Sequence, residues 1–245
     1  MKYYLELNGQ ILYWLLIGPW RKKSFKLSQV FHQTIRIGVE ALPMAALTAF
    51  SIGLTLAMQG AHELQRMGAA LYVPNLVSVS LLRELGPLLM GIIVIGRSGS
   101  AITAELGAMK VSEEIDALEV MAIDPVRFLV VPRFVAMLVM LPVLTVFGNY
   151  VGLVGGWTIC HFALDMNTAS YVLRAVEAAH VGDLYSGLAK SVVFAWLIVT
   201  IASQAGLKVE GGAEGVGLAT THSVVYSILA ILVANALLTA LFFFF

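Results

Sequence analysis

Five long stretches of this 245-residue chain carry almost no charged side chains, and no other feature constrains the fold as strongly. An α-helix needs about 20 predominantly apolar residues to cross the hydrocarbon core of a bilayer. All five stretches reach that length, and only the second and the fourth contain charges, at Arg83-Glu84 and at Lys190. The sequence therefore predicts an all-α integral membrane protein with five transmembrane helices, within residues 41–61, 76–96, 134–164, 184–205 and 215–245.

The composition excludes several classes of protein. Only 12% of the residues are charged, against roughly 25% in soluble domains, and the net charge is +0. These values exclude a soluble globular enzyme, a disordered chain and a nucleic-acid binder. Cys160 is the single cysteine, which excludes a disulfide framework and a multi-cysteine zinc site. The five histidines have no metal-ligand spacing, so we expect no metal and no cofactor in this chain.

The N-terminus differs from the rest of the chain. Residues 3–20 are mostly apolar, but their strongest apolar run, 11–17, is too short to cross a bilayer. Tryptophans and a basic cluster accompany this run and favour a helix lying along the membrane surface; they are Trp14, Trp20, Arg21, Lys22, Lys23 and Lys26. We therefore expect two regions, an interfacial helix with a basic cytosolic segment over 1–38 and a transmembrane domain over 39–245. A weak sixth span is the alternative. A cleavable signal is not expected, because the basic cluster follows the apolar run.

The distribution of lysine and arginine predicts the orientation. With the N-terminus in the cytoplasm, the cytosolic segments hold six basic residues before the first span, four between the second and third spans, and Lys208. The outer segments then hold only Arg66 and Arg174. Basic residues concentrate on the cytoplasmic side of membrane proteins, so the C-terminus is expected outside.

Arg83-Glu84 is the most informative pair inside a span. A charge at mid-helix costs roughly 2.5–3.5 kcal/mol on insertion scales. Adjacent side chains point about 100° apart on a helix, so at least one of the two should find a partner on another helix or in another copy. Pro87 lacks an N–H and crowds the carbonyl of Arg83, which predicts a kinked backbone with an unsatisfied carbonyl. The pair indicates either a polar site inside a transport cavity or an ion pair that holds helices together.

Residues 112–125 predict a short acidic helix in the cytosol between the second and third spans. Ser112 is the expected N-cap and Pro125 the expected end. The first turn is acidic, which the helix dipole favours, with Glu113, Glu114 and Asp116. One face is apolar and is formed by Ile115, Leu118, Met121 and Ala122. We interpret this segment as a docking helix for a soluble partner. A helix lying on the bilayer is the alternative, which its acidity disfavours because the cytoplasmic leaflet is negatively charged.

Two further patterns concern packing. Gly148, Gly152 and Gly156 form a GxxxGxxxG row in the third span, which suits close helix contacts between copies or within one chain. Residues 168–179 predict an outer amphipathic helix with one apolar face, formed by Tyr171, Val172, Ala175, Val176 and Ala179.

Two motifs bear on enzymatic activity. No GxxxxGK[ST] sequence occurs, so the chain cannot bind ATP through a P-loop. Gly96-Arg97-Ser98-Gly99 matches the GxSG of rhomboid-type intramembrane proteases, and His222 opens a later span. A Ser–His dyad is conceivable, but a small-residue helix exit is the favoured interpretation, and the chain has one span too few for that fold.

Three sequence blocks resemble the MlaE (YrbE) family of ABC-transporter permeases, in order and in spacing. They are LLRELGP at 81–87, GRSGSAITAE at 96–105 and EEIDALEVMAIDPVR at 113–127. The resemblance is less dense from about residue 41 to the end and covers little of the first 38 residues.

The resemblance implies a homodimer in a bacterial inner membrane that moves phospholipids or related hydrophobic molecules between membranes. It implies two cytosolic ATPase subunits that bind the ATP, a periplasmic MCE-domain protein and a small accessory cytosolic subunit as partners. The permease itself is then not an enzyme. An ion-coupled secondary transporter that uses Glu84, and the protease, remain as alternatives.

The resemblance also assigns site residues. Arg83 and Glu84, with Leu56 and Gln59 of the first span, are expected near the lipid cavity. The acidic helix is expected to couple to the ATPase through Glu113, Glu114, Asp116, Leu118, Glu119, Met121 and Asp124.

Overall fold

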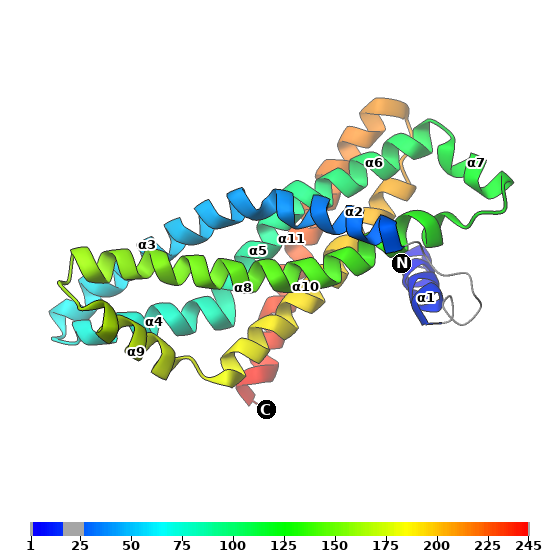
Figure 1. Ribbon diagram of the computed structural model, residues 1–245. Helices are drawn as coiled ribbons and strands as arrows, with labels where there is room; N and C mark the ends of the chain where they lie inside the picture. The colour runs from blue at the N-terminus through cyan, green and yellow to red at the C-terminus, as the bar shows by residue number, and fades with distance from the viewer. Residues whose placement is uncertain (1, 17–26, 245) are drawn as a thin grey trace. The chain divides into compact units, whose positions relative to one another are not determined.

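The computed structural model describes residues 2–16 and 27–244, and all regular structure within these residues is helical (Figure 1). The α-helices are α1 (Lys2–Leu16), α2 (Leu27–Ile37), α3 (Leu42–Arg66), α4 (Val73–Ser80), α5 (Gly86–Val94), α6 (Ser100–Val111), α7 (Glu114–Val120), α8 (Val131–Phe162), α9 (Thr168–Ala178), α10 (Val181–Leu207) and α11 (Gly212–Phe244). Two 3-10 turns (Val39–Ala41 and Ala70–Tyr72) and three π-helical segments join several of them. Trp20 and the basic cluster from Arg21 to Lys26 lie outside the described residues.

Within the described residues, five helical stretches are long and apolar enough to cross a membrane: Leu27–Arg66, Ala70–Val111, Val126–Phe162, Val181–Leu207 and Gly212–Phe244. The predicted fold class is thereby confirmed, with five such helices and a short N-terminal helix, α1. Each stretch begins before the predicted span, and the third ends at Phe162, two residues before its predicted end. The first begins at Leu27, because α2 passes through a single 3-10 turn into α3.

The chain divides into two compact units. The first comprises Met1–Ala41, Gly91–Leu141 and Val193–Ala234, and the second comprises Leu42–Met90, Pro142–Val192 and Asn235–Phe245. Boundaries fall inside α5, α8, α10 and α11, so each of these helices supplies residues to both units.

Large apolar side chains and short hydrogen bonds hold the first unit together. Phe134 of α8 is fully buried, and its ring meets the ring of Trp196 edge to face at 4.9 Å. Thr103 of α6 is also fully buried, and its hydroxyl lies 3.1 Å from the carbonyl of Ala202 and 2.9 Å from the hydroxyl of Ser223. A buried hydroxyl needs such partners, because leaving it unpaired costs about 1–3 kcal/mol.

The second unit relies on close backbone contacts. A Cβ at Gly53 of α3 would overlap the carbonyl oxygen of Gly152 on α8, so only glycine permits this approach. Gly148 faces Met90 and Gly156 faces Val77. The contacts of the glycine row therefore lie within one chain, which supports that one of its two interpretations.

A helix at the predicted position is confirmed as α9, which packs beside α4 (Figure 1). The Asn167 side chain caps its N-terminus by accepting from the backbone N–H of Ala169. On the predicted apolar face, Tyr171 and Ala175 are buried while Val172 and Val176 are exposed. The Tyr171 hydroxyl donates to the carbonyl of Leu153 at 2.8 Å, and burial raises the pKa of this tyrosine.

The three π-helical segments are Leu81–Leu85, Ile95–Gly99 and Val126–Val130. Each overlaps one of the three sequence blocks described above. Single π turns inside α-helices are uncommon and are frequent at functional sites. The blocks therefore coincide with the places where the described helices depart from regular α geometry.

Candidate functional site

A cluster of charged and polar side chains lies inside the second unit around Glu84. Lys190 of α10 is only 1% exposed, and its ammonium group lies 2.6 Å from Oε1 of Glu84. The same ammonium donates to the hydroxyl of Thr239 at 2.8 Å and to the carbonyl of Arg83 at 3.0 Å. An ammonium group has three donors, and these three acceptors satisfy all of them.

The hydrogen bond from Lys190 gives a partner to the Arg83 carbonyl, which Pro87 was predicted to leave unsatisfied. Proline removes the N–H that would normally bind the carbonyl four residues earlier, and that carbonyl belongs to Arg83. The backbone forms a π turn there, in which the N–H of Gly86 donates to the carbonyl of Leu81. Lys190 supplies the hydrogen bond that Pro87 cannot. The same ammonium group therefore binds both the Glu84 carboxylate and the backbone carbonyl of Arg83.

Glu84 and Arg83 reach different partners. The Glu84 carboxylate also accepts from Asn235 at 3.1 Å and from Thr239 at 3.0 Å, both on α11. The Arg83 guanidinium lies 3.3 Å from the carboxylate of Asp183 on α10. The prediction that at least one of the pair finds a partner on another helix is confirmed for both. In the sequence, Lys190 is a single charge in an otherwise apolar span. A lone charge in such a span indicates a partner of opposite charge, which here is Glu84.

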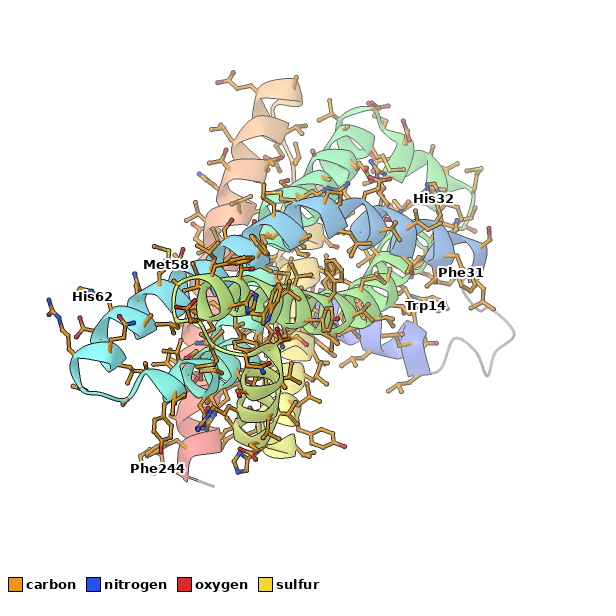
Figure 2. The ribbon with its side chains drawn as sticks, turned by 60° about the vertical axis from the view of Figure 1, so that its left-hand side comes forward. Trp14, Phe31, His32, Met58, His62 and Phe244 are labelled. Carbon is orange, nitrogen blue, oxygen red and sulfur yellow. The ribbon has the colours of Figure 1, made fainter. Side chains whose placement is uncertain are left out.

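The predicted cavity residues of α3 lie in different surroundings. Leu56 is half-buried and packs against the apolar core cluster that contains Ala57 and Leu81. Gln59 is exposed and belongs to a polar face of α3 with Ser51, Thr55 and His62. Figure 2 shows His62 projecting outward from the end of α3. The Ser51 and Thr55 hydroxyls bond to carbonyls four residues earlier, at 2.8 Å.

The acidic helix α7 exists, but its ends differ from the prediction. Ser112 terminates α6 and is not the N-cap of α7; Glu113 holds that place with a left-handed φ of 58° and no side-chain cap bond. The helix ends at Val120 and not at Pro125, because Ala122 takes a left-handed φ of 57° that breaks the helical path.

The apolar residues of α7 and its C-terminal end differ in their exposure. Ile115 is buried and Leu118 half-buried, whereas Met121 and Val120 are 61% and 88% exposed. Glu113, Glu114 and Glu119 are exposed, as is Asp116, which lies 2.7 Å from Lys110. The helix therefore presents carboxylates and two large apolar side chains on its open surface.

Asp124 has structural partners that sequence reasoning missed. Its Oδ1 accepts from the backbone N–H groups of Val126 and Arg127, at 2.9 and 3.1 Å, which caps the helix that follows. Its Oδ2 accepts from the indole of Trp14 at 3.0 Å. The Arg127 guanidinium lies over the same indole ring, 5.2 Å from its centroid. These contacts fasten α1 to the segment that follows α7.

The geometry gives no support to a serine protease dyad. Ser98 is buried, and its hydroxyl lies 3.4 Å from the carbonyl of Ile37. His222 is exposed on α11 and stacks edge to face with Tyr226. Each residue thus has partners that explain its place without catalysis.

Comparison with known proteins identifies relatives over most of the chain. A family described as permease MlaE matches residues 30–241. A probable ABC transporter permease protein of Rickettsia prowazekii is 39% identical over 222 residues, covering 91% of this chain and 86% of the relative. The intermembrane phospholipid transport system permease protein MlaE of Haemophilus influenzae is 35% identical over 239 residues, covering 96% and 90%. The chloroplastic protein TRIGALACTOSYLDIACYLGLYCEROL 1 of Arabidopsis thaliana is 33% identical over 239 residues, covering 97% and 66%.

Proposed function

This chain belongs to the MlaE family of ABC-transporter permeases, and from that premise we propose that it moves phospholipids or related hydrophobic molecules between the inner and outer membranes. The observation that carries the proposal is the match to a relative named as an intermembrane phospholipid transport permease, which spans 96% of this chain. A permease subunit is not itself catalytic, and the family implies a separate ATPase as the energy source.

The exposed surface of α7 is the proposed contact with that ATPase. Glu113, Glu114 and Glu119 offer carboxylates to basic side chains of a partner, and Met121 offers an exposed apolar anchor. Short amphipathic helices are a common way to dock into a partner's groove. ATP binding closes the ATPase subunits, which push on α7, and the push reaches the spans that flank it.

The proposed cavity lies between two copies of the chain. The side chains of Arg83 and Glu84 are 41% and 35% exposed in one copy, and Gln59 lies on the exposed polar face of α3. Charged groups inside a membrane segment favour a bundle interior or a wet cavity. Arg83 is the group best suited to a lipid phosphate, because guanidinium matches phosphate geometry. Leu56 belongs to the apolar wall beside them.

We also propose an orientation in the membrane, a division of the chain into two regions and two further partners. The N-terminus lies in the cytoplasm and the C-terminus in the periplasm of a bacterial inner membrane, with residues 1–38 along the surface and 39–245 as the permease domain. A periplasmic MCE-domain protein receives or delivers the lipid, and a small cytosolic subunit accompanies the ATPase.

Co-purification tests the ATPase contact. Wild-type protein, Glu114→Lys and Glu177→Lys are purified from the native host in mild detergent, and the co-eluting chains are identified by mass spectrometry. Glu177 is a matched control because it is an exposed glutamate on another short helix, α9. We expect an ATPase and an MCE-domain protein with the wild type and the control, and loss of the ATPase with Glu114→Lys.

Transport in proteoliposomes separates this proposal from a secondary transporter. Purified complex moves a fluorescent phospholipid only when ATP is supplied, and an imposed ion gradient has no effect. Transport that follows a proton or sodium gradient without ATP would instead assign Glu84 to an ion site and overturn the proposal.

A further inference from the structure

The helix α2 is amphipathic, and its apolar face is uncovered in the described structure. Leu27, Phe31 and Ile35 recur every four residues and are 68%, 68% and 54% exposed. This spacing places them on one side of the helix. His32 leaves α2 in another direction from Phe31 (Figure 2). Because α2 continues into the first candidate span, this apolar side lies where a helix meets the membrane boundary.

The polar side of α2 borders a pocket of about 400 Å³. Ligand pockets commonly measure roughly 300–1,000 Å³. The pocket lies in the first unit, between α2 and the beginning of the third candidate span. Its lining combines hydrogen-bond donors with three apolar side chains: Ser28, Gln29, His32, Gln33, Phe128, Leu129, Pro132 and Arg133.

Arg133 brings a buried guanidinium to this pocket. The residue is 6% exposed, its Nη1 donates to the carbonyl of Leu129 at 2.8 Å, and its Nη2 donates to Glu105 at 3.0 Å. Its Nε is buried and has no hydrogen-bond partner among the described residues. The guanidinium group brings a positive charge to the wall of the pocket, which favours an anionic ligand.

The surrounding charges favour an anion. Arg36 pairs with the same Glu105 carboxylate as Arg133, so two guanidinium groups share one acid. Arg97 and Glu40 form a separate pair at 2.6 Å, which leaves the network with an excess of one positive charge. Arg21, Lys22, Lys23 and Lys26 directly precede α2 in the sequence and lie outside the described residues. Basic clusters beside an amphipathic helix attract anionic lipids.

We propose that this pocket binds the phosphate headgroup of an anionic phospholipid, whose acyl chains lie along the stripe formed by Leu27, Phe31 and Ile35. The negative charge of the phosphate offsets the excess positive charge around Arg133, and the lipid joins α2 to the start of α8. This is a resident lipid that uses none of the residues proposed for the transport cavity. A soluble phosphate would leave the apolar stripe uncovered, so a lipid is the occupant that satisfies both faces of α2.

Lipid titration of the full chain, followed by native mass spectrometry in detergent, tests the site. The probes are phosphatidylglycerol and phosphatidylcholine, with glycerol 3-phosphate as the soluble competitor. Gln29→Glu places a negative charge at the pocket without breaking a recorded contact, whereas changing Arg133 would also break its pair with Glu105. Gln65→Glu is the matched control, because Gln65 is exposed at the far end of α3.

We expect the wild type to bind one phosphatidylglycerol at least about fivefold more tightly than phosphatidylcholine, the effect of about one charge at a membrane surface. Gln29→Glu should remove this preference, and Gln65→Glu should keep it. Phe31→Ser should weaken both lipids, because it removes acyl-chain contact from both. Equal binding of the two lipids by the wild type, or equal loss in Gln29→Glu and Gln65→Glu, would overturn the site. Displacement of the lipid by glycerol 3-phosphate would show a soluble phosphate site and reject the lipid.

Discussion

At the scale of single residues, Lys190 explains how the second candidate span tolerates two adjacent charges. Each unpaired charge in a span would cost several kcal/mol. Lys190 neutralises Glu84, Asp183 neutralises Arg83, and hydroxyl and amide groups on α11 complete the shell around the carboxylate. Arg83 and Glu84 therefore each form an ion pair with another helix of the same copy. The exposed parts of both side chains remain available for the proposed cavity.

Removal of Lys190 should be strongly destabilising. Removing one partner of a buried ion pair costs about 3–5 kcal/mol, and we expect about 3 kcal/mol for Lys190→Met because Glu84 is partly exposed. The double variant Lys190→Met with Glu84→Gln should recover part of the loss, since no unpaired charge remains. Thermal unfolding in detergent measures both. Additive losses in the double variant would contradict the coupling.

At the scale of elements, the contact between α3 and α8 depends on missing side chains. A Cβ at Gly53 would overlap the carbonyl oxygen of Gly152, and a Cβ at Gly152 would lie 2.9 Å from a methyl group of Leu81. Gly60 lies on the same helix as Gly53, but a Cβ there would meet Leu76 at an ordinary 3.6 Å. The same substitution should thus have opposite effects at these two glycines.

Gly53→Ala should destabilise the protein by about 2 kcal/mol, within the usual range for overpacking. Gly60→Ala should be neutral or stabilise by up to about 1 kcal/mol, because alanine is the better helix former. The two midpoints of thermal unfolding, measured side by side in the same detergent, check the prediction. A similar loss at both positions would mean that the backbone contact does not govern the packing.

The connection after α7 offers a second test at this scale. Asp124 caps the following helix and accepts from Trp14, so its proposed role in ATPase coupling needs separation from its structural role. Asp124→Ala should lower stability by about 1 kcal/mol or more, the usual cost of a lost N-cap. Asp124→Asn keeps one acceptor oxygen, which can still cap the helix, but it places an NH2 donor where Oδ2 accepts from Trp14, and it should cost less.

Hydrogen exchange of α1 provides the readout for this contact. We expect faster exchange in α1 for both Asp124→Ala and Asp124→Asn than for the wild type, because neither side chain can accept from Trp14 and cap the following helix as the carboxylate does. Unchanged ATPase co-purification with Asp124→Asn would assign the residue to structure, and loss of the ATPase there would assign it to docking.

At the scale of the whole molecule, the orientation in the membrane rests on the lysine and arginine distribution. In a Cys160→Ala background, Glu113→Cys and Glu177→Cys place single thiols on exposed sites of α7 and α9. A membrane-impermeant maleimide, applied to intact cells with a permeabilised outer membrane, should label Glu177→Cys and leave Glu113→Cys unlabelled. Labelling in the opposite pattern would reverse the proposed orientation.

The sequence by itself determined the features that depend on local chemistry. The length and apolarity of each stretch predicted five candidate spans, and Pro87 predicted an unsatisfied carbonyl at Arg83. The three sequence blocks indicated the family that the comparisons then identified. These properties are visible within a few turns of chain, because a helix satisfies its own backbone and its apolar length is a local quantity.

Only the tertiary structure decided which distant groups meet. Glu84 and Lys190 are 106 residues apart, and no local pattern says that one lysine serves both the carboxylate and the orphaned carbonyl. The glycine row could have packed between copies as well as within one chain. Ser112 and Pro125 are suited to cap a helix, but α7 uses neither. The helix α2 forms within a segment that the sequence predicts only as basic and cytosolic. Pairing, capping and pocket formation depend on how helices approach each other in space, which the order of the residues does not record.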